Sequence, residues 1–207
     1  MQYRPRILVV DTDNKRAMER NVKKVCEAGQ RIHVMTALNW ESFERLLWRG
    51  GRTWYLKKIK VQRRLDCAII NGNADLRDEN GIAHTSIPLA MMLAENRVPV
   101  LMHSPAHKNQ KVRQIQDGCA NHPNITAFET TVVPSVAKLC VIDKTTAIRM
   151  MAVIKFARMG GGKTMEAQKS LTKMLKKMKA DTRDLCLRIL QFESAEIQEM
   201  IKKMSTA

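Results

Sequence analysis

The sequence predicts an α/β protein with a doubly wound, five-stranded parallel sheet followed by a helical C-terminal extension. Three observations predict this fold class. Short apolar runs and helix-like segments alternate five times within about 130 residues. The apolar runs are rich in β-branched residues and continuous, as is typical of strands buried on both faces. Beyond residue 133 almost every segment has helical periodicity instead.

The first half of the sheet follows in order along the chain. A strand is predicted at 6–11, where an apolar run is closed by an acid, and a helix capped by Asp13 or Asn14 runs to about residue 28. Gly29 is the natural end of that helix. A second strand at 32–36 leads to a helix that Asn39 can cap.

The second half begins with a third buried strand at 65–71, followed by a polar loop at 72–81. A helix at 86–95 carries Pro88 in its first turn, where proline is tolerated. The remaining predicted elements are a strand at 98–102, a basic helix at 108–118 and a strand at 125–130.

The C-terminal part is predicted to be helical. The segment after Pro134 fits a helix or a strand, and helices are predicted at 145–159, 164–179, 181–192 and 194–204. We therefore predict two regions. Residues 1–133 form the α/β domain, with a basic insertion at about 48–64, and residues 134–207 form the helical extension.

The charge predicts a polyanionic partner, because 36 Lys and Arg stand against 20 Asp and Glu, for a net charge of +16. The densest basic segment, 45–64, holds eight basic residues and no acid, and aromatic residues lie among them. Basic side chains neutralise phosphates, and aromatic rings can stack on bases. The candidate nucleic-acid-binding residues are Arg45, Arg49, Arg52, Trp54, Lys57, Lys58, Lys60, Arg63 and Arg64. A solvated basic loop with its aromatic residues packed on the domain is the alternative.

Cellular location is suggested by two further features. The sequence has no apolar run long enough to span a membrane. Its five cysteines are scattered and form no Cys-x-x-Cys pair, so a disulfide framework is not expected. We expect a cytoplasmic protein without a membrane partner.

The opening of the chain resembles that of a response-regulator receiver domain. The resemblance lies in the Arg-Ile-Leu-Val-Val-Asp-Thr-Asp-Asn run at 6–14, the helix ending at Gly29 and the segment 36–47. The runs at 65–71 and 98–104 fall where that family has its third and fourth strands. The resemblance covers about residues 5–130 and implies a flavodoxin-like sheet.

The resemblance also implies a site at the ends of the strands, where the family phosphorylates an aspartate with the help of Mg²⁺, a hydroxyl and a lysine. Asp11 matches one metal-binding acid, and Asp13 is the candidate for the second because Thr12 occupies its usual place. Asn71 falls at the phosphoacceptor position, and Ser104 matches the hydroxyl.

This site departs from the family pattern. The amide of Asn71 is a far poorer nucleophile than a carboxylate, and no lysine is evident after the fifth strand. We therefore interpret the domain as a degenerate pseudo-receiver with a vestigial phosphoacceptor site. Asp66 or Asp75 would serve as acceptor if the register were shifted.

Two further motifs suggest chemistry that we disfavour. His103, His107, Cys119 and His122 have the spacing of a zinc site, but the predicted topology places the first pair and the second pair at opposite ends of the sheet. The glycines of 157–164 loosely match a phosphate-binding loop, but no strand precedes them. We expect no catalytic residue, metal or cofactor.

These observations predict a non-catalytic signalling or regulatory protein that acts by binding a partner or a nucleic acid. The alternative is a basic structural component of a nucleoprotein assembly that binds DNA or RNA non-specifically. The C-terminal helices could also hold a protein partner, and a homodimer remains compatible with the sequence.

Overall fold

The structure of the protein is a computed structural model that describes residues 4–12, 16–26, 31–47, 65–103, 122–158, 163–191, 193, 198–199 and 202. Its centre is a sheet of five parallel strands: β1 (Arg6–Val10), β2 (His33–Ala37), β3 (Cys67–Asn71), β6 (Val100–His103) and β7 (Ile125–Phe128). The strand order is β2-β1-β3-β6-β7. This is the flavodoxin-like, doubly wound order, so the predicted fold class is confirmed.

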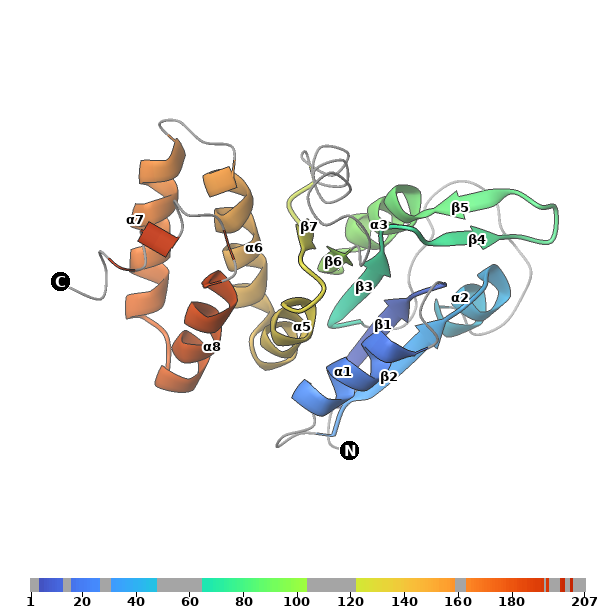
Figure 1. Cartoon of the computed structure of the whole chain (residues 1–207), viewed down its shortest axis with the longest axis horizontal. Helices are drawn as coiled ribbons and strands as arrows, with labels where there is room; N and C mark the ends of the chain where they lie inside the picture. Colours follow the sequence, from blue (N-terminus) through green and yellow to red (C-terminus); the bar gives the residue numbers. More distant parts are fainter. Residues whose placement is uncertain are drawn as a thin grey trace.

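Helices cover both faces of the sheet (Figure 1). One face carries α1 (Ala17–Cys26) and α5 (Val133–Ile142), which pack against each other. The other carries α2 (Trp40–Leu47) and α3 (Ser86–Glu95). Successive strand residues point to opposite faces, so each strand contributes to two cores.

The two cores show this alternation directly. On β1, Ile7 and Val9 belong to the core beneath α1 and α5, whereas Leu8 and Val10 belong to the core beneath α2 and α3. All four side chains are fully buried. The continuous apolar run in the sequence therefore reflects burial on both faces.

The extension consists of α6 (Lys144–Arg158), α7 (Lys163–Lys176) and α8 (Ala180–Leu190). These helices lie beside the β7 edge of the sheet, on the left in Figure 1. Their apolar residues, among them Ile154, Leu171 and Ile189, belong to the same core as α1 and α5. The division at residue 133 remains a prediction, and α5, which begins there, completes one face of the sheet.

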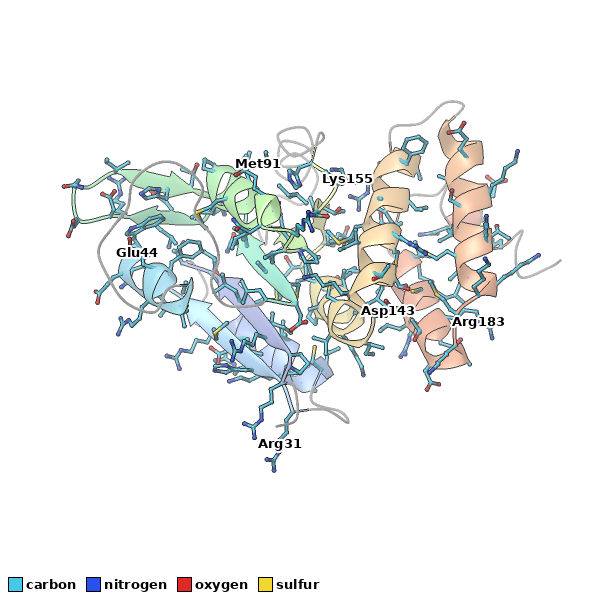
Figure 2. All side chains as sticks on the ribbon, turned by 180° about the vertical axis from the view of Figure 1, so that it is seen from behind. Arg31, Glu44, Met91, Asp143, Lys155 and Arg183 are labelled. Carbon is cyan, nitrogen blue, oxygen red and sulfur yellow. The ribbon has the colours of Figure 1, made fainter. Side chains whose placement is uncertain are left out.

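Basic side chains of α6 satisfy carbonyl groups near the open edge of β7. The Lys155 ammonium donates to the His122 carbonyl at 2.6 Å, and the Arg158 guanidinium donates to the Ala127 carbonyl at 2.8 Å. Figure 2 shows Lys155 between α6 and β7. The helix therefore covers an edge that could otherwise pair with another chain.

The segment predicted as a polar loop at 72–81 instead contains the first strand and the turn of a β-hairpin, made of β4 (Asp75–Arg77) and β5 (Ala83–Thr85). It projects beyond the main sheet at the right of Figure 1. Leu76 of β4 is fully buried, and the ring of His84 of β5 stacks on Trp40 of α2 with 3.6 Å between ring centroids. Two strands of three residues are marginal alone, so these contacts hold the hairpin in place.

Two general predictions can be compared with the described residues. Cys26, Cys67, Cys140 and Cys186 are buried and form no disulfide with one another, whereas Cys119 lies outside the described residues. No helix in the described ranges is both long and apolar enough to cross a membrane. The predicted helix at 108–118 and most of the one at 194–204 lie outside the described residues.

Candidate functional site

Three polar side chains lie at the carboxyl ends of three neighbouring strands. Asp11 follows β1, Asn71 ends β3 and His103 ends β6. The register pairs Asn71 with His103. Each lies two residues beyond a core residue of the α1 and α5 face, so the three side chains continue that face. We call Asp11, Asn71 and His103 the polar edge.

The polar edge is closed by a hydrogen bond between Asn71 and Asp11. The Asn71 Nδ2 donates to Asp11 Oδ1 at 3.0 Å, and both side chains are buried. The Asn71 Oδ1 accepts from the Asn73 backbone N–H, also at 3.0 Å. That second bond fixes which end of the amide carries the oxygen, so the donor necessarily faces the carboxylate.

His103 completes the polar edge as a neutral imidazole. Only 2% of the residue is exposed. Burial lowers the pKa of His103 to about 4, and the nearby Asp11 carboxylate offsets only part of that shift. Its Nδ1 lies 3.5 Å from the Thr130 hydroxyl, and its Nε2 is buried and has no hydrogen-bond partner among the residues that the structure describes.

This arrangement holds no carboxylate at the position that the receiver resemblance assigns to the acceptor. The two alternatives from the sequence also lie elsewhere. Asp66 precedes β3, at the amino-terminal end of the strands and so opposite Asp11. Its carboxylate accepts from the Arg6 backbone N–H at 2.7 Å. Asp75 lies exposed on the hairpin, and its carboxylate is 3.5 Å from the Arg77 guanidinium. The structure therefore places neither beside Asp11.

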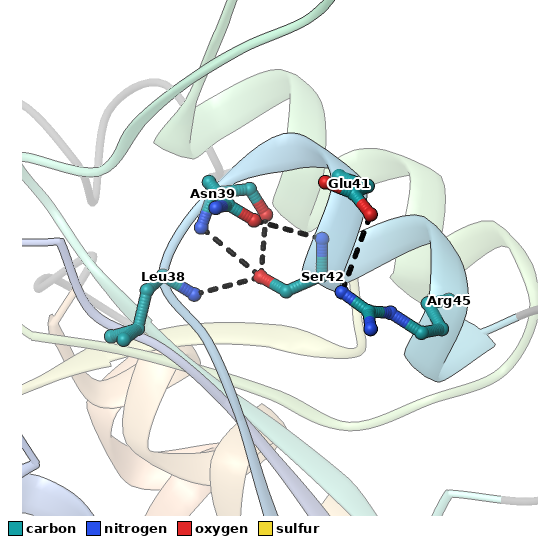
Figure 3. A network of polar contacts seen from close by, with 5 residues as sticks. All are labelled: Leu38, Asn39, Glu41, Ser42 and Arg45. Atoms are coloured by element: carbon teal, nitrogen blue, oxygen red, sulfur yellow. Dashed lines mark hydrogen bonds and ion pairs between the residues drawn. The ribbon is translucent and has the colours of Figure 1, made fainter.

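The other predicted members of the vestigial site, Asp13 and Ser104, lie outside the described residues. The same holds for every candidate nucleic-acid-binding residue except Arg45, namely Arg49, Arg52, Trp54, Lys57, Lys58, Lys60, Arg63 and Arg64. Arg45 lies exposed on α2, and its guanidinium is 3.4 Å from the Glu41 carboxylate (Figure 3).

Figure 3 also shows why α2 begins where the sequence predicts. The Asn39 side chain accepts from the Ser42 backbone N–H at 2.8 Å, and the Ser42 hydroxyl accepts from the Asn39 backbone N–H at 3.1 Å. This reciprocal pair satisfies free N–H groups at the helix start. It positions Arg45 one turn further on.

The candidate zinc ligands are only partly described. His103 ends β6, whereas His122 precedes the neighbouring strand β7, so the two lie at opposite ends of these parallel strands. His107 and Cys119 lie outside the described residues. Within the described ranges, no three His, Cys, Asp or Glu side chains are grouped to hold a metal ion.

Two parts of this region are not predicted from the sequence. The spacing of His103 makes it a metal candidate, although its place at the end of an apolar strand run puts it next to Asn71. The second part is the ion pair of Arg158 with Glu193, which joins α6 to the turn after α8 at 2.7 Å. The ring of Phe128 lies 5.7 Å beneath the same guanidinium. No sequence signal marks a contact between residues so far apart.

The comparisons with known proteins add little to this geometry. Neither the protein-family models nor the curated proteins match this chain. Among solved structures, full-length FixJ from B. japonicum is similar over 100% of both chains, with a TM-score of 0.38 and 11% sequence identity. The fold assignment therefore rests on the strand order and register of this chain.

Proposed function

We propose that this protein is a non-catalytic regulatory protein that acts by binding, with a receiver-like domain that no longer accepts a phosphoryl group. The observation that supports this is the Asn71–Asp11 hydrogen bond at 3.0 Å. Phosphorylation needs a free carboxylate as nucleophile. Here the side chain at that position is an amide whose nitrogen and oxygen are both hydrogen-bonded.

Incubation with acetyl phosphate and Mg²⁺ tests the non-catalytic part of the proposal. Intact-protein mass spectrometry is expected to show no added phosphoryl group, while an active response regulator in the same reaction gains one. A hydroxylamine-sensitive phosphoryl group on Asp11, Asp66, Asp75 or any other acid would contradict the proposal. The assay reads a covalent product, so it does not depend on knowing the partner.

The binding part of the proposal assigns a nucleic acid as the partner. The net charge of +16 is its support, because a basic protein gains affinity for phosphate backbones through counterion release. Fluorescence anisotropy with labelled DNA and RNA is expected to show binding at low salt that falls steeply as salt rises. Binding to neither would contradict this part and direct the search to acidic proteins.

A structural role in a nucleoprotein assembly is the second candidate, favoured by the same charge. The two roles differ in how much nucleic acid each protein binds and in whether the purified protein already carries it. A structural component is expected to copurify with nucleic acid at an absorbance ratio typical of nucleoprotein and to release it at high salt. A regulatory protein is expected to purify without nucleic acid and to bind it at defined stoichiometry when it is added.

A further inference from the structure

Two groups of basic residues in the extension, one on α6 and one on α7, differ in whether they already have partners. The first group holds α6 against the sheet. Lys144 donates to the Leu65 carbonyl at 3.1 Å, Lys155 to the His122 carbonyl at 2.6 Å, and Arg158 to Ala127 and Glu193. These side chains are partly buried and already have partners. They contribute to the net charge of the extension, but their donor groups already bind carbonyl and carboxylate oxygens of the protein and are not available to a ligand.

The second group lies on α7. Lys169, Lys173 and Lys176 are exposed, and none of them forms an ion pair with a residue that the structure describes. Their spacings of four and three residues place them on one side of the helix. We call these three residues the lysine stripe. Lys177 and Lys179 continue the positive charge beyond the end of α7, and both are exposed.

The side of α7 opposite the stripe is occupied. Ala167, Leu171 and Leu175 are buried, and α7 packs against α6. The lysine stripe therefore faces away from the protein and is fixed in direction by this packing. A lysine side chain can reach several ångströms from such a surface, but the helix beneath it cannot rotate.

The lysine stripe opposes the formation of its own helix. Like charges three or four residues apart destabilise a helix by about 0.2–0.5 kcal/mol per pair. Lys173 has such a neighbour on each side, and Glu166 is the single acid in the sequence of α7. A bound polyanion would remove this repulsion, so the cost in the free protein points to a ligand.

We propose that the lysine stripe of α7 binds the phosphate backbone of a nucleic acid without selecting its sequence. The proposal rests on the proposed function and identifies its binding surface. Lysine acts as a point charge toward phosphate. The sequence of α7 contains no aromatic residue, so no base can stack on it. Duplex and single strands should therefore bind with similar strength at this surface.

A membrane surface fits the same charge less well. Helices that bind membranes insert an apolar side among the lipids. The apolar side of α7 is already used against α6, as the burial of Leu171 and Leu175 shows. Only the charged side remains available, and its lysines can contact phosphate groups but cannot insert among lipid chains.

The test replaces the stripe in the full chain by Lys169→Gln, Lys173→Gln and Lys176→Gln together. Glutamine is a good helix former, so α7 should persist, which far-UV circular dichroism checks. The matched control removes the same charge away from α7 by Arg20→Gln, Lys24→Gln and Arg31→Gln, all at exposed side chains. Figure 1 shows α1, which carries the first two, well away from α7, and Figure 2 labels Arg31. Affinity for a mixed-sequence DNA duplex and for its single strand is measured by anisotropy at several salt concentrations.

The stripe variant is expected to lose about tenfold or more in affinity at low salt, with the duplex salt slope falling by about 0.9 for each lost phosphate contact. The control variant is expected to stay close to the wild type. Equal losses in both variants would mean that only net charge matters and would overturn the inference, while the binding function would stand.

Two other outcomes also overturn it. Loss of binding with Lys57, Lys58, Arg63 and Arg64 changed to Glu, but not with the stripe variant, would place the surface in the 45–64 segment and leave the proposed function intact. Tighter binding to phosphatidylserine vesicles than to either nucleic acid would identify a membrane ligand. If the wild type binds no nucleic acid at low salt, the proposed binding function fails together with this inference.

Discussion

At the scale of single residues, the polar edge combines a buried carboxylate, an amide and a neutral imidazole. Asn71 satisfies one carboxylate oxygen of Asp11, whereas the Nε2 of His103 has no hydrogen-bond partner within the described part of the chain. A buried polar atom without a hydrogen bond costs about 1–3 kcal/mol. His103 is therefore a site where the protein gives up stability, and its protonation state makes that cost depend on pH.

Replacement of His103 by Leu should reduce the acid sensitivity of the fold. The unfolded chain takes up a proton near the ordinary histidine pKa of 6.5, whereas the folded protein does so only at about 4. Between these values the unfolded state binds more protons, so stability falls as the pH falls, by about 1.4 kcal/mol per pH unit. His103→Leu should lose about 3 kcal/mol less than the wild type between pH 7 and pH 4.

Urea denaturation at a series of pH values measures this difference. At pH 7 the variant is expected to be at least as stable as the wild type, because it removes an unsatisfied nitrogen. His33→Leu is the control, since this histidine is exposed at the start of β2. Parallel pH curves for the wild type and His103→Leu would show that His103 protonates normally in the folded state.

At the scale of secondary-structure elements, the end of α3 holds a residue that does not suit its backbone conformation. The end of α3 is a Schellman motif, in which Val98 N–H bonds to the Leu93 carbonyl and Arg97 N–H to the Ala94 carbonyl. Glycine usually occupies the left-handed position of this motif. Here Arg97 does so, with a φ of 60°. A residue with a side chain is strained in that conformation.

Arg97→Gly should therefore stabilise the protein by about 0.5–1 kcal/mol, the balance of relieved strain and the greater freedom of glycine in the unfolded chain. Thermal denaturation measures the shift. Arg97→Ala removes the same charge but keeps the Cβ, and it should leave stability unchanged within about 0.5 kcal/mol. Equal stabilisation by both variants would assign the gain to charge instead of backbone strain.

The contact of α6 with the turn after α8 depends on a largely buried ion pair. The Arg158 guanidinium is 2.7 Å from Glu193, whose side chain is 6% exposed. Burial raises the pKa of Glu193 even though Arg158 opposes that shift. Arg158→Met keeps the apolar stem but leaves the carboxylate without its partner, at a cost of about 3 kcal/mol or more.

The pH dependence of this loss identifies its origin. As the pH falls through the raised pKa of Glu193, the carboxyl group becomes neutral, and the destabilisation of Arg158→Met should shrink. Adding Glu193→Met should recover most of it at pH 7. Arg149→Met, on the exposed side of the same helix, should change the free energy of unfolding by less than about 0.5 kcal/mol. A loss that does not vary with pH would point to packing alone.

The sequence predicts regular elements well where burial sets their pattern. The five strands are visible because each is buried on both faces, and the start of α2 is visible because Asn39 and Ser42 form a local cap. The hairpin of β4 and β5 was missed because its strands have only three residues each. Asn80-Gly81 is a hairpin-turn signal that could have revealed it.

The candidate site is predictable only in part, for the same reason. The contact of Asp11 with Asn71 follows from strand order, because the carboxyl ends of adjacent parallel strands share one edge. The burial of His103 and the hydrogen bonding of its two ring nitrogens depend on the residues packed around it, which the sequence does not indicate. The pairing of Arg158 with Glu193 depends on how three helices fold back, which no local pattern encodes.

At the scale of the whole molecule, one apolar core joins the sheet to the extension. It runs from Val22 of α1 through Ile69 of β3 to Ile154 of α6 and Ile189 of α8. Polar contacts from Lys144, Lys155 and Arg158 reinforce the same boundary. The lysine stripe, in contrast, lies on the side of α7 that faces away from this core. Docking and the proposed binding thus use different basic side chains.

This shared core predicts that the sheet and the extension unfold together. Ile154 is fully buried on α6, so Ile154→Ala should cost about 3 kcal/mol through lost burial and the remaining cavity. In a single cooperative unit, that loss must appear everywhere that exchanges by global unfolding. Hydrogen exchange followed by mass spectrometry should show equal loss of protection in the slowest amides of β1, β3 and α8.

The control is Ile142→Ala at the end of α5, because this side chain is 50% exposed and should cost less than about 1 kcal/mol. Faster exchange confined to α6, α7 and α8 in Ile154→Ala would show that the extension opens without the sheet. The core would then consist of two units in contact, and the lysine stripe could move relative to the polar edge. Uniform loss of protection instead means that both belong to one cooperatively unfolding unit.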